Sequence, residues 1–146
     1  MVNIYVESKG SELPEYAHHG DSGMDVKTTI KEPVCLGPLE RKVFPTGLHV
    51  VIPEGYEIQV RPRSGLAAKR GLTVLNTPGT IDSNYRGEIG VILVNLSNEA
   101  QVIEPGERIA QLVVAKVEEA KLIKVDTVQK NTTERGGNGY GSSGKF

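Results

Sequence analysis

The last residues of the chain combine groups that suit the binding of an anionic, flat ligand. Among the glycines of Arg135–Phe146 stand the guanidinium of Arg135, the aromatic ring of Tyr140 and the hydroxyls of Ser142 and Ser143. Glycine lets backbone N–H groups approach phosphate oxygens closely, while the side chains add hydrogen-bond donors and a stacking face. The segment has too little apolar surface to fold alone, so we expect it to be mobile until a ligand orders it. The alternative is an ordinary disordered terminus.

A second basic segment surrounds the expected start of a helix. The pattern predicts a helix of about two turns over residues 64–70, with Ser64 as its N-cap and Gly71 at its end. Free amides at a helix N-terminus attract anions, and here Arg63 and Gly65 flank that point. The segment therefore indicates a phosphate site, or else a helix cap that lies beside surface arginines.

Residues 76–90 place a carboxylate and an aromatic ring close together. We interpret the segment as two strands joined in a hairpin, with Asp82 just before the turn and Tyr85 three residues further along the same hairpin. Asn76 offers both a donor and an acceptor, which suits the edge of a nucleobase. The alternative is a polar turn whose tyrosine packs on the sheet.

Two further polar positions interrupt apolar strands. Gln111 lies in an apolar run and must find a partner if it is buried, either a phosphate or a neighbouring backbone group. Residues 17–26 predict a loop that leads into a strand, with Asp25 at the boundary. His18 and His19 are adjacent, so their rings diverge and a metal site is not favoured. We expect Asp25 to fix the geometry of the loop.

The elements that must position these groups are strands. The chain has 146 residues, 38% of them hydrophobic and none of them Trp, so a core of Val, Ile and Leu is expected. Proline and glycine separate short runs with strand character. The runs are Leu48–Ile52, Tyr56–Val60, Gly90–Asn95 and Ile109–Val114. Many short strands at such spacing predict a sandwich, jelly roll or barrel.

Charge and cysteine content narrow the possible partners. A net charge of −1 gives no overall attraction to nucleic acid or to a membrane surface. Cys35 is the only cysteine, which excludes a disulfide framework, and we interpret it as a small core residue. Residues 1–7 have strand character without features of a targeting signal, so we expect a cytoplasmic protein.

Taken in order, these segments resemble the deoxyuridine triphosphate nucleotidohydrolases, the trimeric dUTPases, over nearly the whole chain. The matching motifs are Arg63-Ser64-Gly65-Leu66-Ala67, Gly79-Thr80-Ile81-Asp82-Ser83-x-Tyr85-x-Gly87-Glu88, Gly106-x-Arg108-Ile109-Ala110-Gln111 and Arg135 through Gly144. The chain departs from the family pattern at three positions. Ser22 replaces the usual Ala, Asn138 the usual Gly and Tyr140 the usual Phe, and the last change keeps an aromatic ring.

The resemblance implies an all-β subunit, a jelly-roll-like or distorted β-barrel with one short helix. Residues 1–126 would form the hydrolase domain and residues 127–146 a flexible C-terminal tail that closes the active site. The expected assembly is a homotrimer with active sites shared between subunits, and neither nucleic acid nor a membrane is an expected partner. The implied reaction is hydrolysis of dUTP to dUMP and pyrophosphate by water attack at the α-phosphorus. It would limit uracil incorporation into DNA and supply dUMP for thymidylate synthesis.

The resemblance also implies a role for each site residue. Asp82 would be the general base, and Asp25 would support the site. The phosphates would be bound by Arg63, Ser64, Gly65, Gln111, Arg135, Ser142 and Ser143. Uracil and deoxyribose would be bound by Asn76, Gly79, Thr80, Ile81, Tyr85, Gly90 and Tyr140. The cofactor Mg²⁺ would be held by the phosphates and water, without direct protein ligands, as suits an ion that keeps much of its hydration shell.

Two other functions use related features. A dCTP deaminase has a related fold but would need a glutamate acid/base at the pyrimidine, whereas this chain has Asp82 and the complete tail. A catalytically silent nucleotide-binding regulator is the second alternative, and the presence of Asp82 and Arg135 argues against it.

Overall fold

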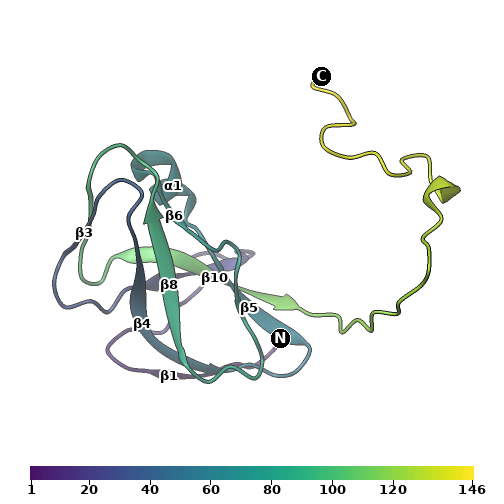
Figure 1. Ribbon diagram of the computed structural model, residues 1–146. Helices are drawn as coiled ribbons and strands as arrows, with labels where there is room; N and C mark the ends of the chain where they lie inside the picture. The colour runs from purple at the N-terminus through teal and green to yellow at the C-terminus, as the bar shows by residue number, and fades with distance from the viewer.

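The computed structural model describes residues 1–146 as a β-rich body with one α-helix and a long C-terminal extension (Figure 1). The strands are β1 (Tyr5–Ser8), β2 (Gly23–Lys27), β3 (Val34–Leu36), β4 (Arg41–Val51), β5 (Tyr56–Arg61), β6 (Leu72–Val74), β7 (Gly79–Ile81), β8 (Glu88–Asn95), β9 (Gln101–Ile103) and β10 (Arg108–Lys116). The helix α1 spans Ser64–Arg70, and a 3₁₀ turn spans Lys130–Thr132. No helix has the length and apolar character needed to cross a membrane.

Two four-stranded antiparallel sheets enclose the core. One has the order β1-β4-β8-β6 and the other the order β2-β10-β5-β7, while β3 and β9 form a separate two-stranded sheet. Aliphatic side chains from both sheets meet between them, together with Phe44. The all-β class expected from the sequence is confirmed.

Alternation along β8 divides its side chains between the core and the surface. Ile89, Val91 and Leu93 are completely buried, as expected for every second residue of a strand that faces a core. Gly90 and Ile92 between them face outward and are only partly covered. The outer face of β8 is therefore available to form a binding surface.

The predicted helix is confirmed over residues 64–70, but its cap differs from the expectation. Arg63, not Ser64, is the N-cap, because its backbone is extended (φ −87°, ψ 127°) and its carbonyl accepts the amide of Ala67. Ser64 is the first helical residue. Gly71 ends the helix as predicted, with φ +64°, a conformation that glycine adopts without strain.

The segment from residue 76 to residue 90 is not a hairpin. β7 pairs with β5 in one sheet, whereas β8 pairs with β4 and β6 in the other. Residues 82–87 therefore cross from one sheet to the other. A local sequence pattern shows that two strands flank a turn, but the partner of each strand depends on distant residues, which is why the hairpin prediction was wrong.

Cys35 lies on the surface, so the prediction of a core position was wrong. It lies opposite Val102 across the β3–β9 pair, and both side chains are exposed. The neighbouring Leu36 points to the other face and is buried. Adjacent strand residues face opposite sides, and this small sheet is covered on one side only.

The chain leaves the packed body at the end of β10. β10 ends at Lys116, ahead of the expected boundary at residue 126, and residues 117–138 are all exposed. In Figure 1 this extension runs away from the sheets. The side chains of Leu122 and Ile123 are 94% and 76% exposed. Apolar side chains of this kind are usually buried in a folded domain, but in a single chain nothing covers these two.

Candidate active site

Asp25 and Arg63 form an ion pair within a group of polar and basic residues beside strands β2 and β10. Asp25 lies inside β2 and not at its boundary, directly opposite Gln111 of β10. Its Oδ2 atom is 3.0 Å from Arg63 Nη2, and Arg63 Nη1 donates to the backbone carbonyl of Arg108 at 3.3 Å. We call Asp25, Arg63, Ser64, Gly65, Arg108 and Gln111 the anion cluster.

Gln111 is held by the backbone, the second of the two partners considered from the sequence. Its Nε2 atom donates to the carbonyl of Pro62 at 3.0 Å, which ties β10 to the residue that leads into α1. The side chain has room only because residue 23 is glycine, since a Cβ there would lie 3.0 Å from Gln111 Cδ and closer still to Oε1. Gln111 and Gly23 thus fix the approach to the first turn of α1.

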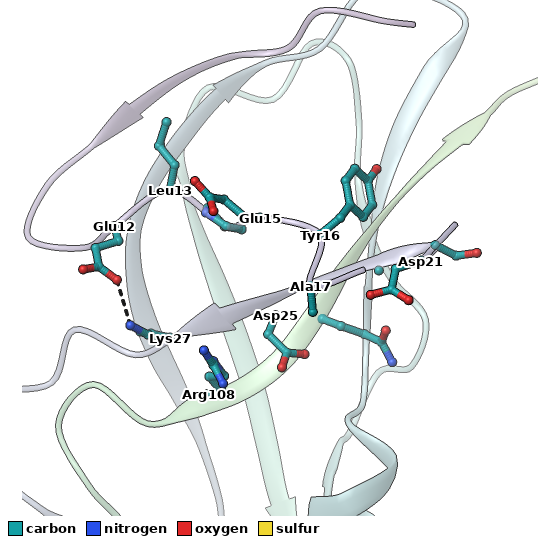
Figure 2. A pocket seen from close by; sticks show the side chains of 13 residues that line it. Glu12, Leu13, Glu15, Tyr16, Ala17, Asp21, Asp25, Lys27 and Arg108 are labelled. Atoms are coloured by element: carbon teal, nitrogen blue, oxygen red, sulfur yellow. Dashed lines mark hydrogen bonds and ion pairs between the residues drawn. The ribbon is translucent and has the colours of Figure 1, made fainter. Parts of the chain in front are cut away.

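A pocket of about 860 Å³ is lined in part by Asp25, Arg108 and Gln111 of the anion cluster (Figure 2). Asp25, Lys27 and Arg108 border it, and the segment that contains Tyr16 and Ala17 crosses the opposite side. Lys27 donates to Glu12 Oε2 at 2.8 Å, and this hydrogen bond lowers the pKa of the Glu12 carboxyl. Sequence reasoning did not assign a role to Arg108, although its position in a matching motif was a signal.

A second pocket, of about 360 Å³, lies on the outer face of β8. It is lined by Val43, Thr80, Ile81, Asp82, Tyr85, Glu88, Gly90 and Ile92. We call it the nucleoside pocket. The structure thereby brings together five of the residues named from the sequence and adds Val43, Glu88 and Ile92, which sequence reasoning missed. A side chain at Gly90 would close the pocket wall, because a Cβ there would lie 2.8 Å from Val43 Cγ1.

Asp82 is exposed at the edge of the nucleoside pocket, immediately after β7. It also lines a neighbouring cleft of about 800 Å³ that contains Glu54, Glu57 and Glu119. A carboxylate in this position can receive a proton from a water molecule above the pocket.

Asn76 and Gly79 lie outside the lining of the nucleoside pocket. Asn76 is exposed, and its amide covers Gly79, since a Cβ on Gly79 would be 3.4 Å from Asn76 Nδ2. Gly79 itself is buried against Val60. Within one chain Asn76 lies in the loop before β7, and Gly79 is the first residue of that strand.

The anion cluster and the nucleoside pocket are separate places on one chain. The pocket along the cluster and the nucleoside pocket share no lining residue. The tail residues Tyr140, Ser142 and Ser143 are exposed and line neither, and Arg135 Nε donates only to the carbonyl of Asn138 at 2.9 Å. No group of three or more His, Cys, Asp or Glu side chains is arranged to hold a metal ion.

Comparison with known proteins assigns the chain to one family. The family model described as dUTPase matches residues 9–144. The deoxyuridine 5′-triphosphate nucleotidohydrolase of Fusobacterium nucleatum is 58% identical over 140 residues, which cover 96% of this chain and 94% of the relative. The enzyme of the same name from Treponema denticola is 54% identical and covers 98% of this chain and 99% of its own length.

Solved structures show the same fold. A G164S mutant of the Staphylococcus bacteriophage 80alpha dUTPase, determined with dUpNHpp, superposes with a TM-score of 0.85 at 31% identity and covers 99% of both chains. A D95N mutant of the dUTPase from phage phi11 of S. aureus superposes with a TM-score of 0.77 at 26% identity and covers 88% of this chain and 99% of its own. That protein is described as coordinating a structural Mg(II) ion.

Proposed function

This chain belongs to the dUTPase family and hydrolyses dUTP to dUMP and pyrophosphate, and we propose that its catalytic site forms between copies of the chain, with Asp82 as the general base. Family membership at this level of identity decides against the deaminase and the silent regulator. The roles of the individual residues are our proposal and are argued below from their geometry.

The separation of the two pockets carries the proposal of a shared site. A triphosphate attached to a nucleoside in the nucleoside pocket needs a cationic partner, yet the anion cluster contributes no residue to that pocket. A second copy that presents its Arg63 and Gln111 beside Asp82 of the first would complete the site. A closed ring of identical copies satisfies this arrangement, and a homotrimer with three such sites is the assembly that we propose.

The chemical step is the attack of one water molecule on the α-phosphorus. Asp82 accepts a proton from that water as its oxygen forms the new P–O bond. The bond from the α-phosphorus to the bridging oxygen breaks, and pyrophosphate leaves with the electron pair. Phosphoryl transfer of this kind depends mostly on positioning and charge neutralisation, so the remaining site residues bind and orient the substrate.

The anion cluster supplies the charge. Arg63, with its ion pair to Asp25, is fixed at the start of α1, where Ser64 and Gly65 present backbone amides. Gln111 keeps this turn in place through Pro62. Mg²⁺, an ion that keeps much of its hydration shell, would be held by the triphosphate and water and would neutralise phosphate charge.

The nucleoside pocket supplies the selectivity. Tyr85 is 42% exposed, and we propose that its ring packs against the deoxyribose and leaves no space for a 2′-hydroxyl. The backbone around Ile81 and Gly90 would bind uracil, together with Thr80 and with Asn76, whose amide can pair with a base edge.

The C-terminal extension closes the site. Its glycines permit close contact with phosphates, and we propose that Arg135, Ser142 and Ser143 bind the triphosphate while Tyr140 stacks on the base. The apolar residues of 117–128 are uncovered in one chain, which supports contact between this segment and another copy.

Mixing two inactive variants tests the shared site. Chains with Arg63→Ala and chains with Asp82→Asn are each expected to be nearly inactive alone. After joint refolding, sites that take Arg63 from one chain and Asp82 from the other are intact, so about a quarter of wild-type activity is expected in a random mixture. Each variant refolded alone is the control. If the mixture is no more active than its components, the site lies within one chain.

A further inference from the structure

Tyr85 is held by hydrogen bonds at its backbone amide and at its side-chain hydroxyl. Its backbone amide donates to the carbonyl of Asp82 at 3.1 Å, and its hydroxyl donates to the carbonyl of Glu88 at 2.9 Å. The side chain therefore links residue 85 to the first residue of β8, and it borders the nucleoside pocket. An exposed tyrosine without these bonds would sample several rotamers.

Gly87 leaves the space that this ring position requires. A Cβ atom on residue 87 would lie 2.5 Å from Tyr85 Cζ, 3.0 Å from Cε2 and closer still to the hydroxyl oxygen. The backbone of Gly87 does not have a positive φ, so its conformation is open to any residue. Glycine is therefore required at position 87 by the position of the Tyr85 ring and not by the backbone conformation.

Glu88 fixes the carbonyl to which the phenol is bonded. Its Oε1 atom accepts the amide of Gly47 at 2.8 Å, at the point where the register of β4 shifts between Pro45 and His49. The next residue is held as well, because Thr46 Oγ1 donates to the carbonyl of Ile89 at 2.6 Å. The irregular part of β4 thus anchors the start of β8.

We propose that Gly87 and Glu88 are positioning residues that set the discrimination between dUTP and UTP by holding the ring of Tyr85 in one place. The proposal rests on the proposed function, in which that ring stands where a 2′-hydroxyl would lie. A ring that excludes a group as small as a hydroxyl must not move, because a shift of about 1 Å is enough to change such positioning. Neither residue needs to contact the substrate through its side chain.

The test measures kcat/KM for dUTP and for UTP in a set of variants. Gly87→Ala displaces the phenol and is expected to lower the dUTP/UTP ratio at least about tenfold. Gly10→Ala is the matched control. Residue 10 has φ +81° and open space around it, so the same change strains the backbone but does not touch the ring. It is expected to lower the melting temperature and keep the ratio.

A second pair of variants decides the matter even if Gly87→Ala does not fold. Glu88→Gln retains a side-chain oxygen that can accept the amide of Gly47 and is expected to keep the ratio, whereas Glu88→Ala is expected to lower it. Tyr85→Ala tests the proposed function itself. If Tyr85→Ala lowers the ratio while Gly87→Ala and Glu88→Ala do not, the positioning role is overturned. If Tyr85→Ala leaves the ratio unchanged, exclusion by the ring is wrong, and the positioning role fails with it.

Discussion

The carboxylate of Asp25 on β2 holds the guanidinium of Arg63 at the start of α1, with 3.0 Å between Oδ2 and Nη2. Both side chains are about one-third exposed, so the ion pair contributes little to the free energy of unfolding. Its consequence is geometric. The guanidinium, which also donates to the carbonyl of Arg108, is confined to one orientation beside the first amides of the helix.

Asp25→Asn is expected to reduce activity without unfolding the protein. The amide keeps the shape but removes the charge that restrains Arg63, so kcat/KM for dUTP should fall about tenfold or more, mainly through KM. The free energy of unfolding should change by less than about 1 kcal/mol in urea titrations. Glu7→Gln, which breaks the exposed Lys9–Glu7 ion pair, is the control and should leave both quantities unchanged. Wild-type kcat/KM in Asp25→Asn would show that the ion pair does not position Arg63.

Asp82→Asn is expected to abolish most turnover while the fold and ligand binding remain. An amide has nearly the same shape as the carboxylate but cannot accept the proton of the attacking water. General-base contributions are typically about 10²–10⁴ in rate, so kcat should fall by that factor. Calorimetry with a non-hydrolysable dUTP analogue checks binding, and Glu32→Gln, a change to an exposed carboxylate between β2 and β3, is the control. Near-normal turnover in the folded variant would remove Asp82 from the mechanism.

Local patterns in the sequence predicted most elements but not their partners. The helix at 64–70 and its end at Gly71 follow from nearest neighbours, and the structure has both. The pairing of β7 with β5, far from β8 in the sheets, depends on residues distant in the sequence. The same limit explains Cys35, which a short apolar run suggested to be buried, although the small sheet that contains it leaves one face open.

The residues of the candidate site were likewise predicted only in part from the sequence. Asp82, Tyr85 and Gly90 stand in one short segment, residues 76–90, and the structure gathers them in one pocket. Val43 has no such signal, because it enters the pocket only through its pairing with Ile92 across β4 and β8. Spacing alone also could not reveal that, within one chain, no residue of the anion cluster lines this pocket.

Asn95 is expected to be a strong determinant of stability, remote from the site. Its side chain is completely buried and makes four hydrogen bonds, to the carbonyls of Leu36 and Glu99 and to the amide and hydroxyl of Ser97. Asn95→Ala removes the Asn95 partner of the Leu36 carbonyl and of the Ser97 amide, while the Ser97 hydroxyl keeps its bond to the carbonyl of Glu99. Each unsatisfied buried group costs about 1–3 kcal/mol. Urea unfolding should show a loss of roughly 2–4 kcal/mol. The exposed Asn3→Ala is the control, and an equally small effect of both changes would mean that water replaces the lost bonds.

Removal of the tail should separate stability from catalysis. In a chain that ends at Asn131, the deleted residues bury no core side chain, so assembly and the melting temperature should stay as in the full chain. Hydrolysis of dUTP should slow strongly, because Arg135, Tyr140, Ser142 and Ser143 no longer enclose the triphosphate and exclude water.

The energetics of closure make the prediction specific to the ligand. Ordering about a dozen residues costs on the order of 1–2 kcal/mol each for the backbone alone, so contacts with the phosphates and with the base must act together. Deoxyuridine should therefore leave the tail mobile, whereas a non-hydrolysable dUTP analogue with Mg²⁺ should order it. Loss of the sharp tail resonances in NMR spectra and protection from proteases would report this ordering. Full activity of the shortened chain would mean instead that the tail is an ordinary disordered end, without a part in the reaction.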